Sequence, residues 1–158
     1  MSAVTHVKGL QILLLAPLGW LAACSRPAVQ PAGAPTPVYN KTTGQLEQLV
    51  SDRNGDGKPD TWAFMTGTRI TKIELDRNAE RQPDRWEYYS APPADGSPTI
   101  IERADEANGE DGRTITRHER YARGVLQRVD DDTAGDGRPD KWETYEGGRL
   151  ARVDLDLT

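Results

Sequence analysis

Gly44-Gln45-Leu46-Glu47-Gln48-Leu49 begins a unit that returns along the chain and decides the fold. In each copy an aspartate lies eight residues after the first residue. The first three copies then continue into a Pro-Asp-x-Trp motif. The further copies of the segment 44–49 lie at 68–73, 124–129 and 148–153. The Pro-Asp-x-Trp motifs begin at Pro59, Pro83 and Pro139. A short repeat of this kind indicates an array of stacked supersecondary units.

Each unit is typical of two β-strands. Trp62 and Phe64 alternate on one face, as do Ile73 and Leu75, and Gly/Asn/Asp/Pro clusters bound the segments. The three-residue step from Leu46 to Leu49 predicts a β-bulge or two partly buried faces. An eroded unit at 99–121 fills the longest interval of the repeat. We therefore expect an all-β fold, an antiparallel meander of about eight to nine strands that forms a twisted sheet or an open barrel.

The N-terminal segment has the layout of a signal peptide. Lys8 precedes an apolar run over 10–21, which is too short to span a bilayer as a helix, and small residues lead to Cys24. Leu21-Ala22-Ala23-Cys24 resembles the lipobox of bacterial lipoproteins. The resemblance implies removal of residues 1–23, acylation (palmitate included) of Cys24, and a membrane anchor made by two or more chains. The alternative is an ordinary secretory signal with an unpaired cysteine.

The lipoprotein resemblance also implies a cellular location, and the composition indicates the order of the domains. Ser25, where an aspartate favours inner-membrane retention in enteric bacteria, favours the outer membrane of a Gram-negative cell. Residues 24–43, which contain four prolines among small residues, are expected to form a lipidated linker. Residues 44–158 are expected to form the β-repeat domain.

Removal of residues 1–23 removes one cation and no acid, so the net charge of −5 becomes −6, which argues against nucleic-acid binding.

The first loop has the composition of a calcium site. Oxygen side chains stand at its first, third, fifth and ninth positions, and Lys58 at the seventh would contribute a backbone carbonyl. The side-chain ligands would be Asp52, Asn54, Asp56 and Asp60. The loop resembles EF-hand loops and the strand-flanked calcium loops of β-propeller repeats, although Ala63 at the twelfth position replaces the EF-hand glutamate. With three carboxylates and one amide as side-chain ligands, we expect weak binding, with a dissociation constant on the order of 10⁻⁵ to 10⁻³ M.

Other loops keep less of the pattern. Asp132, Asp136 and Asp140 form a weaker candidate calcium site, in which Ala134 occupies the third position. In the second loop, which begins at Asp76, Arg81 stands at the sixth position, where the first loop has Gly57. The alternative for all of these loops is a set of hairpin turns, in which Asn-Gly and Asp-Gly are common without any metal.

The aromatic residues and the single histidine after the signal carry little sign of catalysis. Trp62, Trp86 and Trp142 are expected to pack as a core ladder, with a sugar- or peptide-binding stripe as the alternative. His118 occupies a tryptophan position of the repeat, which favours a packing role over that of a base. The paired-carboxylate chemistry of a hydrolase stays open, because acids are abundant.

Three hypotheses of function follow. The first is a non-enzymatic, lipid-anchored cell-envelope protein, a β-repeat scaffold or binding module with weak calcium loops and an unknown protein or envelope partner. The second is a metal-independent protein–protein interaction module, since segments such as 145–150 also resemble the Y-x-x-G-x-L hairpins of bacterial repeat proteins. The third is a carboxylate-based hydrolase. Exposed edge strands would also allow self-association.

Overall fold

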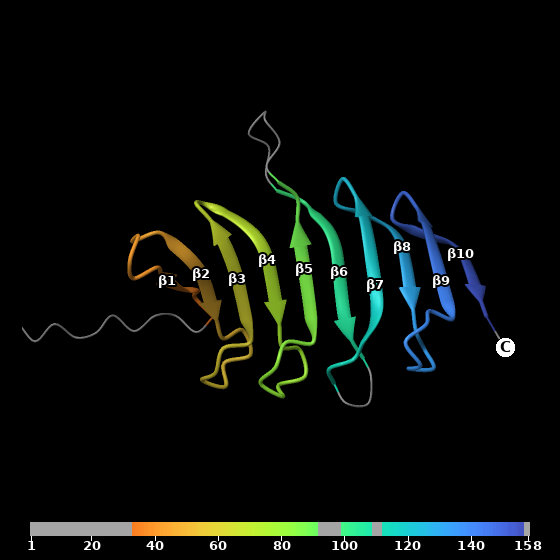
Figure 1. Ribbon diagram of the computed structural model, residues 1–158, viewed down its shortest axis with the longest axis horizontal. Helices are drawn as coiled ribbons and strands as arrows, with labels where there is room; N and C mark the ends of the chain where they lie inside the picture. Colours follow the sequence, from red (N-terminus) through yellow and green to blue (C-terminus); the bar gives the residue numbers. More distant parts are fainter. Residues whose placement is uncertain (1–32, 92–98, 109–111, 157–158) are drawn as a thin grey trace, which may run out of the picture.

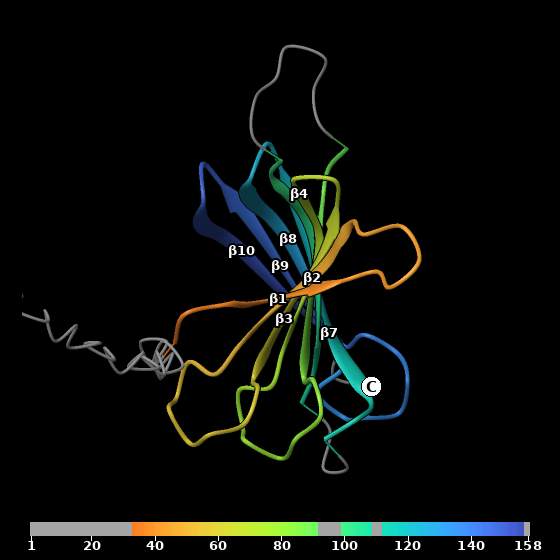
Figure 2. The ribbon, with the colours of Figure 1, turned by 90° about the vertical axis from the view of Figure 1, so that its left-hand side faces the viewer.

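The computed structural model describes residues 33–91, 99–108 and 112–156, which form one ten-stranded antiparallel sheet (Figure 1). Each strand pairs with the next in the chain, so the strand order is the sequence order. The strands are β1 Thr36–Tyr39, β2 Leu46–Ser51, β3 Thr61–Thr66, β4 Arg69–Leu75, β5 Arg85–Tyr89, β6 Ile101–Ala107, β7 Ile115–Ala122, β8 Val125–Asp131, β9 Lys141–Glu146 and β10 Arg149–Leu155. The predicted all-β meander is confirmed in its open form, because β1 and β10 lie at opposite edges (Figure 1). The sheet is twisted, as the fanned strands show (Figure 2).

The sheet begins earlier in the chain than the sequence suggested. β1 lies within the segment 24–43 that was assigned to the linker, and Thr36 pairs with Val50 of β2. The strand contains Pro37, which cannot donate a backbone hydrogen bond and is therefore tolerated at a sheet edge. The described sheet consequently has ten strands, where the repeat pattern suggested eight to nine.

The predicted bulges are present at equivalent positions of the repeat. The register shifts beside the three-residue step of β2, where Leu46 pairs with Tyr39 and Gln48 with Val38. The same shift recurs between Leu150 and Arg152 of β10. A bulge lets both apolar residues of the step face the same side of the sheet and increases the local twist. Shifts of this kind also lie at Phe64/Met65, Tyr88/Tyr89 and Arg120/Tyr121.

Two kinds of connection between strands are important for the site. Tight turns such as Gly147-Gly148 and Arg123-Gly124 have positive φ at both central residues, which suits the twist of the flanking strands. The longer aspartate-rich loops all lie at the opposite ends of the strands, which are the lower ends in Figure 1. The repeat therefore brings all the predicted calcium ligands to the same end of the strands.

No second layer covers the described sheet, and both of its faces are open (Figure 2). Its buried apolar residues among those described are three alanines and one valine: Ala63, Ala104, Ala107 and Val129. The expected core ladder of tryptophans is therefore absent. Trp62, Trp86 and Trp142 share one face but stay half-exposed, because no element packs over them.

Candidate functional site

The first aspartate-rich loop, between β2 and β3, is stabilised by its own backbone amides. Asp52 accepts hydrogen bonds from Gly55 N–H (2.7 Å) and Gly57 N–H (2.8 Å). Asp60, which is buried, accepts from the amides of Arg53 and Asn54, at 2.9 and 3.0 Å. These bonds satisfy donors that the tight backbone would otherwise leave unpaired.

The middle of the same loop follows the same principle. Asn54 Oδ1 accepts from Asp56 N–H at 2.9 Å, and Asp56 Oδ1 accepts from Lys58 N–H at 2.8 Å. Both contacts are local turns in which a side-chain oxygen takes the place of a backbone carbonyl. All four predicted side-chain ligands thus bind amide groups of their own loop.

The loop between β8 and β9 repeats this arrangement. Asp132 accepts from Gly135 N–H and Gly137 N–H, both at 2.7 Å. Asp136 Oδ1 accepts from Arg138 N–H at 2.9 Å. Asp140 binds the amides of Thr133 and Ala134, each at 3.0 Å, and these bonds lower the pKa of its carboxyl. In the weaker candidate site, too, the three aspartates accept hydrogen bonds from backbone amides of their own loop.

The predicted side-chain ligands of the first loop are engaged with backbone amides in this arrangement. Within the described ranges, no group of three or more acidic, histidine or cysteine side chains could hold a metal ion. Six to eight oxygens around calcium would require the aspartates to exchange amide contacts for ion contacts. The donor set as arranged does not fit the ion, and calcium binding at these loops stays a prediction.

Cys24 lies outside the described residues, as do the expected signal peptide and the first part of the expected linker. In the described part of the chain, no helix is long and apolar enough to cross a membrane.

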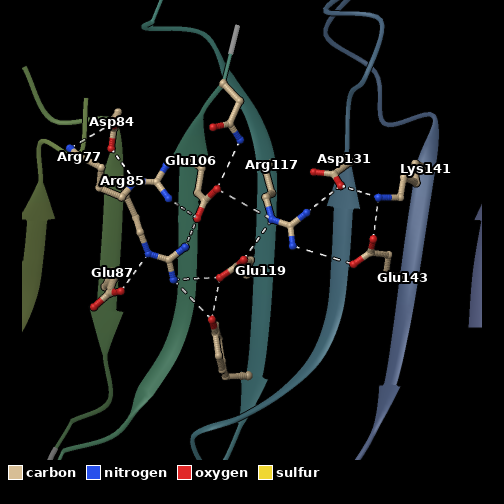
Figure 3. Close-up of polar contacts among 12 residues, drawn as sticks. Arg77, Asp84, Arg85, Glu87, Glu106, Arg117, Glu119, Asp131, Lys141 and Glu143 are labelled. Atoms are coloured by element: carbon tan, nitrogen blue, oxygen red, sulfur yellow. Dashed lines mark hydrogen bonds and ion pairs between the residues drawn. The ribbon is translucent and has the colours of Figure 1, made fainter. Parts of the chain in front are cut away.

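A network of ion pairs, which sequence reasoning missed, crosses one face of the central strands (Figure 3). Arg85 of β5 pairs with Glu87 on its own strand at 2.9 Å and with Glu106 of β6. The same guanidinium reaches Glu119 of β7 at 3.0 Å. Arg77, from the second loop, joins Glu106 at 3.0 Å. Arginine suits this position because its planar group can serve several carboxylates at once.

The network continues from β7 to β9. Arg117 pairs with Glu119 at 3.0 Å and with Asp131 of β8 at 2.8 Å. Its other nitrogen lies 3.9 Å from Glu143 of β9. Lys141 closes the row, with 2.6 Å to Glu143 and 3.4 Å to Asp131. Charged side chains from five consecutive strands are thereby joined on one face (Figure 3).

Tyrosine hydroxyls complete the network. Tyr121 donates to Glu119 at 2.6 Å, and Tyr145 donates to Glu143 at 2.6 Å. Burial alone would raise the pKa of Glu119, but hydrogen bonds from Tyr121, Arg85 and Arg117 outweigh it and lower the pKa below its ordinary value. Burial and the bond to Glu119 together raise the pKa of Tyr121 to about 12. Glu119 is therefore a charged acceptor at neutral pH, which is the opposite of a general acid.

The sequence held a signal for this network. In three units a cation stands directly before the aromatic position and a glutamate directly after it. These triplets are Arg85-Trp86-Glu87, Arg117-His118-Glu119 and Lys141-Trp142-Glu143. Because side chains alternate along a strand, the cation and the glutamate share the face opposite the aromatic ring. Their recurrence could have predicted an ion-pair row.

The other face carries the aromatic row. Across the register, aromatic residues alternate with acids: Trp62, Glu74, Trp86, Asp105, His118, Asp130, Trp142 and Asp154. His118 lies in this row as the repeat predicted, and its Nδ1 is 2.8 Å from Asp105 Oδ1. Arg103 pairs with Asp105 at 3.6 Å and lies over the Tyr88 ring, with 4.1 Å to the ring centroid. This face therefore presents aromatic rings and carboxylates in regular alternation across the strands.

A hollow of about 620 Å³ lies beside the ion-pair network, at the loop between β8 and β9. Glu106, Arg117, Glu119 and Asp131 line it together with the loop residues 132–135. In its wall, Arg117 pairs with Glu119 and Asp131, so the hollow has a polar lining that belongs to the ion-pair network.

Comparison of the sequence with protein-family models and with curated proteins finds no match.

Proposed function

We propose that this chain is a non-enzymatic, lipid-anchored protein of the cell envelope whose repeat sheet serves as a scaffold or a protein-binding module. The observation that carries the proposal is the single-layer sheet with two open faces. Binding modules need an extended rigid surface, and a sheet held together by ion pairs provides one without a second layer. The partner is an envelope protein, and the anchor holds the sheet at the membrane.

The metal-independent form of this proposal is favoured over the calcium-dependent form. Asp52 and Asp60 already stabilise the loop by accepting four backbone hydrogen bonds. Such a loop holds its shape without an ion, as the hairpin-turn alternative requires.

The acids of the central face support a structural role over a hydrolytic one. Hydrogen bonds from Lys141 and from Tyr145 lower the pKa of Glu143, so that this carboxyl stays charged at neutral pH. A hydrolase of the paired-carboxylate class needs one protonated acid. Glu119, whose pKa is also lowered, does not supply it.

The anchor is tested by mass spectrometry of the full chain expressed in a Gram-negative host. We expect a mature N-terminus at Cys24 that carries acyl chains, and recovery of the protein with the outer membrane. Cys24→Ser should lack the acyl mass, and the matched control Ser25→Ala should keep it. An unmodified Cys24 in the wild-type protein would contradict the lipid anchor.

A further inference from the structure

The two edges of the sheet differ in how they are protected. Strand β1 is four residues long and contains Pro37, which removes one backbone donor. Strand β10, at the other edge, has seven residues and no proline, and three of its aliphatic side chains are exposed. No other described strand lies against its outer side. By the measures that limit unwanted strand pairing, β10 is the unprotected edge.

Val129 and Val153 show what β10 lacks. They occupy the same position of the repeat, on β8 and β10. Val129 is 0% exposed, because β7 and β9 flank it on both sides, whereas Val153 is 44% exposed with β9 alone. Leu150 and Leu155, on the same face, are 53% and 59% exposed. One added strand would give Val153 the surroundings of Val129.

The backbone of β10 is oriented to accept such a strand. Asp156 N–H donates to Asp140 O on the β9 side at 2.7 Å. Because alternate residues of an antiparallel strand point their backbone groups to opposite neighbours, Asp154 also faces β9, whereas Val153 and Leu155 face outward. In β4, Leu75 holds the position equivalent to Leu155, and its carbonyl accepts from Asp84 N–H at 2.8 Å.

Charge selects one register for the pairing of β10 with a second β10. Outward-facing residues must pair with outward-facing residues, so the two-fold axis passes through a residue. In the regular part of β10, which follows the bulge, it can lie at Arg152, Val153, Asp154 or Leu155. An axis at Arg152 or Asp154 would oppose two like charges directly, and an axis at Leu155 would oppose Asp154 and Asp156, which is destabilising. An axis at Val153 places Arg152 opposite Asp154 of the second copy, twice, and packs the two valines against each other.

We propose that this protein forms a closed two-fold dimer in which β10 pairs antiparallel with β10 of a second copy, with Val153 on the axis. The two sheets then continue into one. Arg152 already pairs with Asp154 of its own strand at 2.6 Å, and both are exposed. In the dimer the four charges alternate in sign around the axis. The proposal is independent of the lipid anchor, which has its own test.

Charge exchange tests the register. In the full chain in detergent, we expect a dimer by sedimentation, with Arg152→Asp and Asp154→Arg each weakening association roughly tenfold to a hundredfold. The two single variants should associate when mixed, because each Asp then meets an Arg. The double exchange Arg152→Asp/Asp154→Arg should restore the homodimer. Unchanged melting temperatures of the single variants at a concentration where the protein is monomeric would show that they fold.

Cross-linking tests the axis. Val153→Cys should form a disulfide-linked dimer under mild oxidation, since directly paired residues of an antiparallel ladder lie about 5.5 Å apart. Leu155→Cys is the matched control, because the proposed register places it opposite Ala151. The unchanged chain controls for Cys24. A monomer at all concentrations, open-ended oligomers, equal cross-linking at both positions, or unaffected association of the charge variants would overturn the proposal.

Discussion

Ala79 adopts a backbone conformation that disfavours any residue with a side chain. Its φ is 63°, and it holds the loop position that Gly55 holds at φ 78° and Gly135 at φ 73°. The second loop thus keeps the fold of its neighbours without their glycines. Left-handed conformation costs a residue with a Cβ roughly 1–2 kcal/mol. Arg81, which the sequence showed in place of the glycine at the sixth position, also has a positive φ, of 68°. Only the structure shows that the turn is kept and strained at both positions.

We expect Ala79→Gly to stabilise the protein. Relief of the strain is partly offset by the larger entropy of the unfolded chain, so the net gain is on the order of 0.5–1 kcal/mol. Thermal unfolding would show this as a rise of a few degrees in melting temperature.

Gly55→Ala is the matched control for this change, with the opposite sign. A Cβ at Gly55 would have no atom within 4 Å, so only the backbone conformation opposes it. A melting temperature that falls for Ala79→Gly, or one that is unaffected by Gly55→Ala, would contradict the strain.

At the scale of the strand and the loop, the sequence predicted what depends on local pattern. Alternation placed Trp62 and Phe64 on one face, and the step from Leu46 to Leu49 marked a bulge, as the register confirms. The sequence missed β1, because Pro37 and its neighbours have the composition of a linker and their pairing partner lies in β2. It also wrongly placed the tryptophans in a core, because alternation within a strand does not reveal whether a second layer exists.

The aspartate-rich loop yields a second prediction. Asp52→Ala removes the acceptor of two backbone amides, so we expect a loss of about 1–2 kcal/mol of stability. Because this acceptor works without an ion, the loss should be the same in millimolar calcium and in chelator. Chemical denaturation under both conditions measures it.

The calcium hypothesis predicts a different outcome for the same pair of proteins. A dissociation constant of about 10⁻⁴ M would stabilise the wild-type chain by roughly 1.4 kcal/mol in 1 mM calcium. Asp52→Ala would lose that gain. A calcium-dependent difference between the two proteins would therefore overturn the metal-independent form of the proposed function.

At the scale of the whole molecule, polar groups outnumber apolar ones in the buried set. Among the described residues, nine buried polar or charged residues stand against four buried apolar ones. A sheet with so little apolar burial depends on pairing its charges, because a buried charge without a partner is costly. The network from Arg77 to Lys141 fills that need across the central strands (Figure 3). Its dependence on five strands explains why no single unit of the sequence revealed it.

Acid should therefore weaken the sheet as a whole. The pKa values of Glu119 and Glu143 are lowered in the folded state, so their contribution is complete above the unfolded pKa of about 4.5 and is lost as the pH falls through the folded values. We expect the melting temperature to decline steeply below about pH 4.5. Glu119→Gln should melt lower at pH 7 and decline less, because it lacks one of the two titrating groups. The exposed Glu102→Gln should follow the wild-type curve, and an identical pH dependence for Glu119→Gln would show that the network does not hold the sheet together.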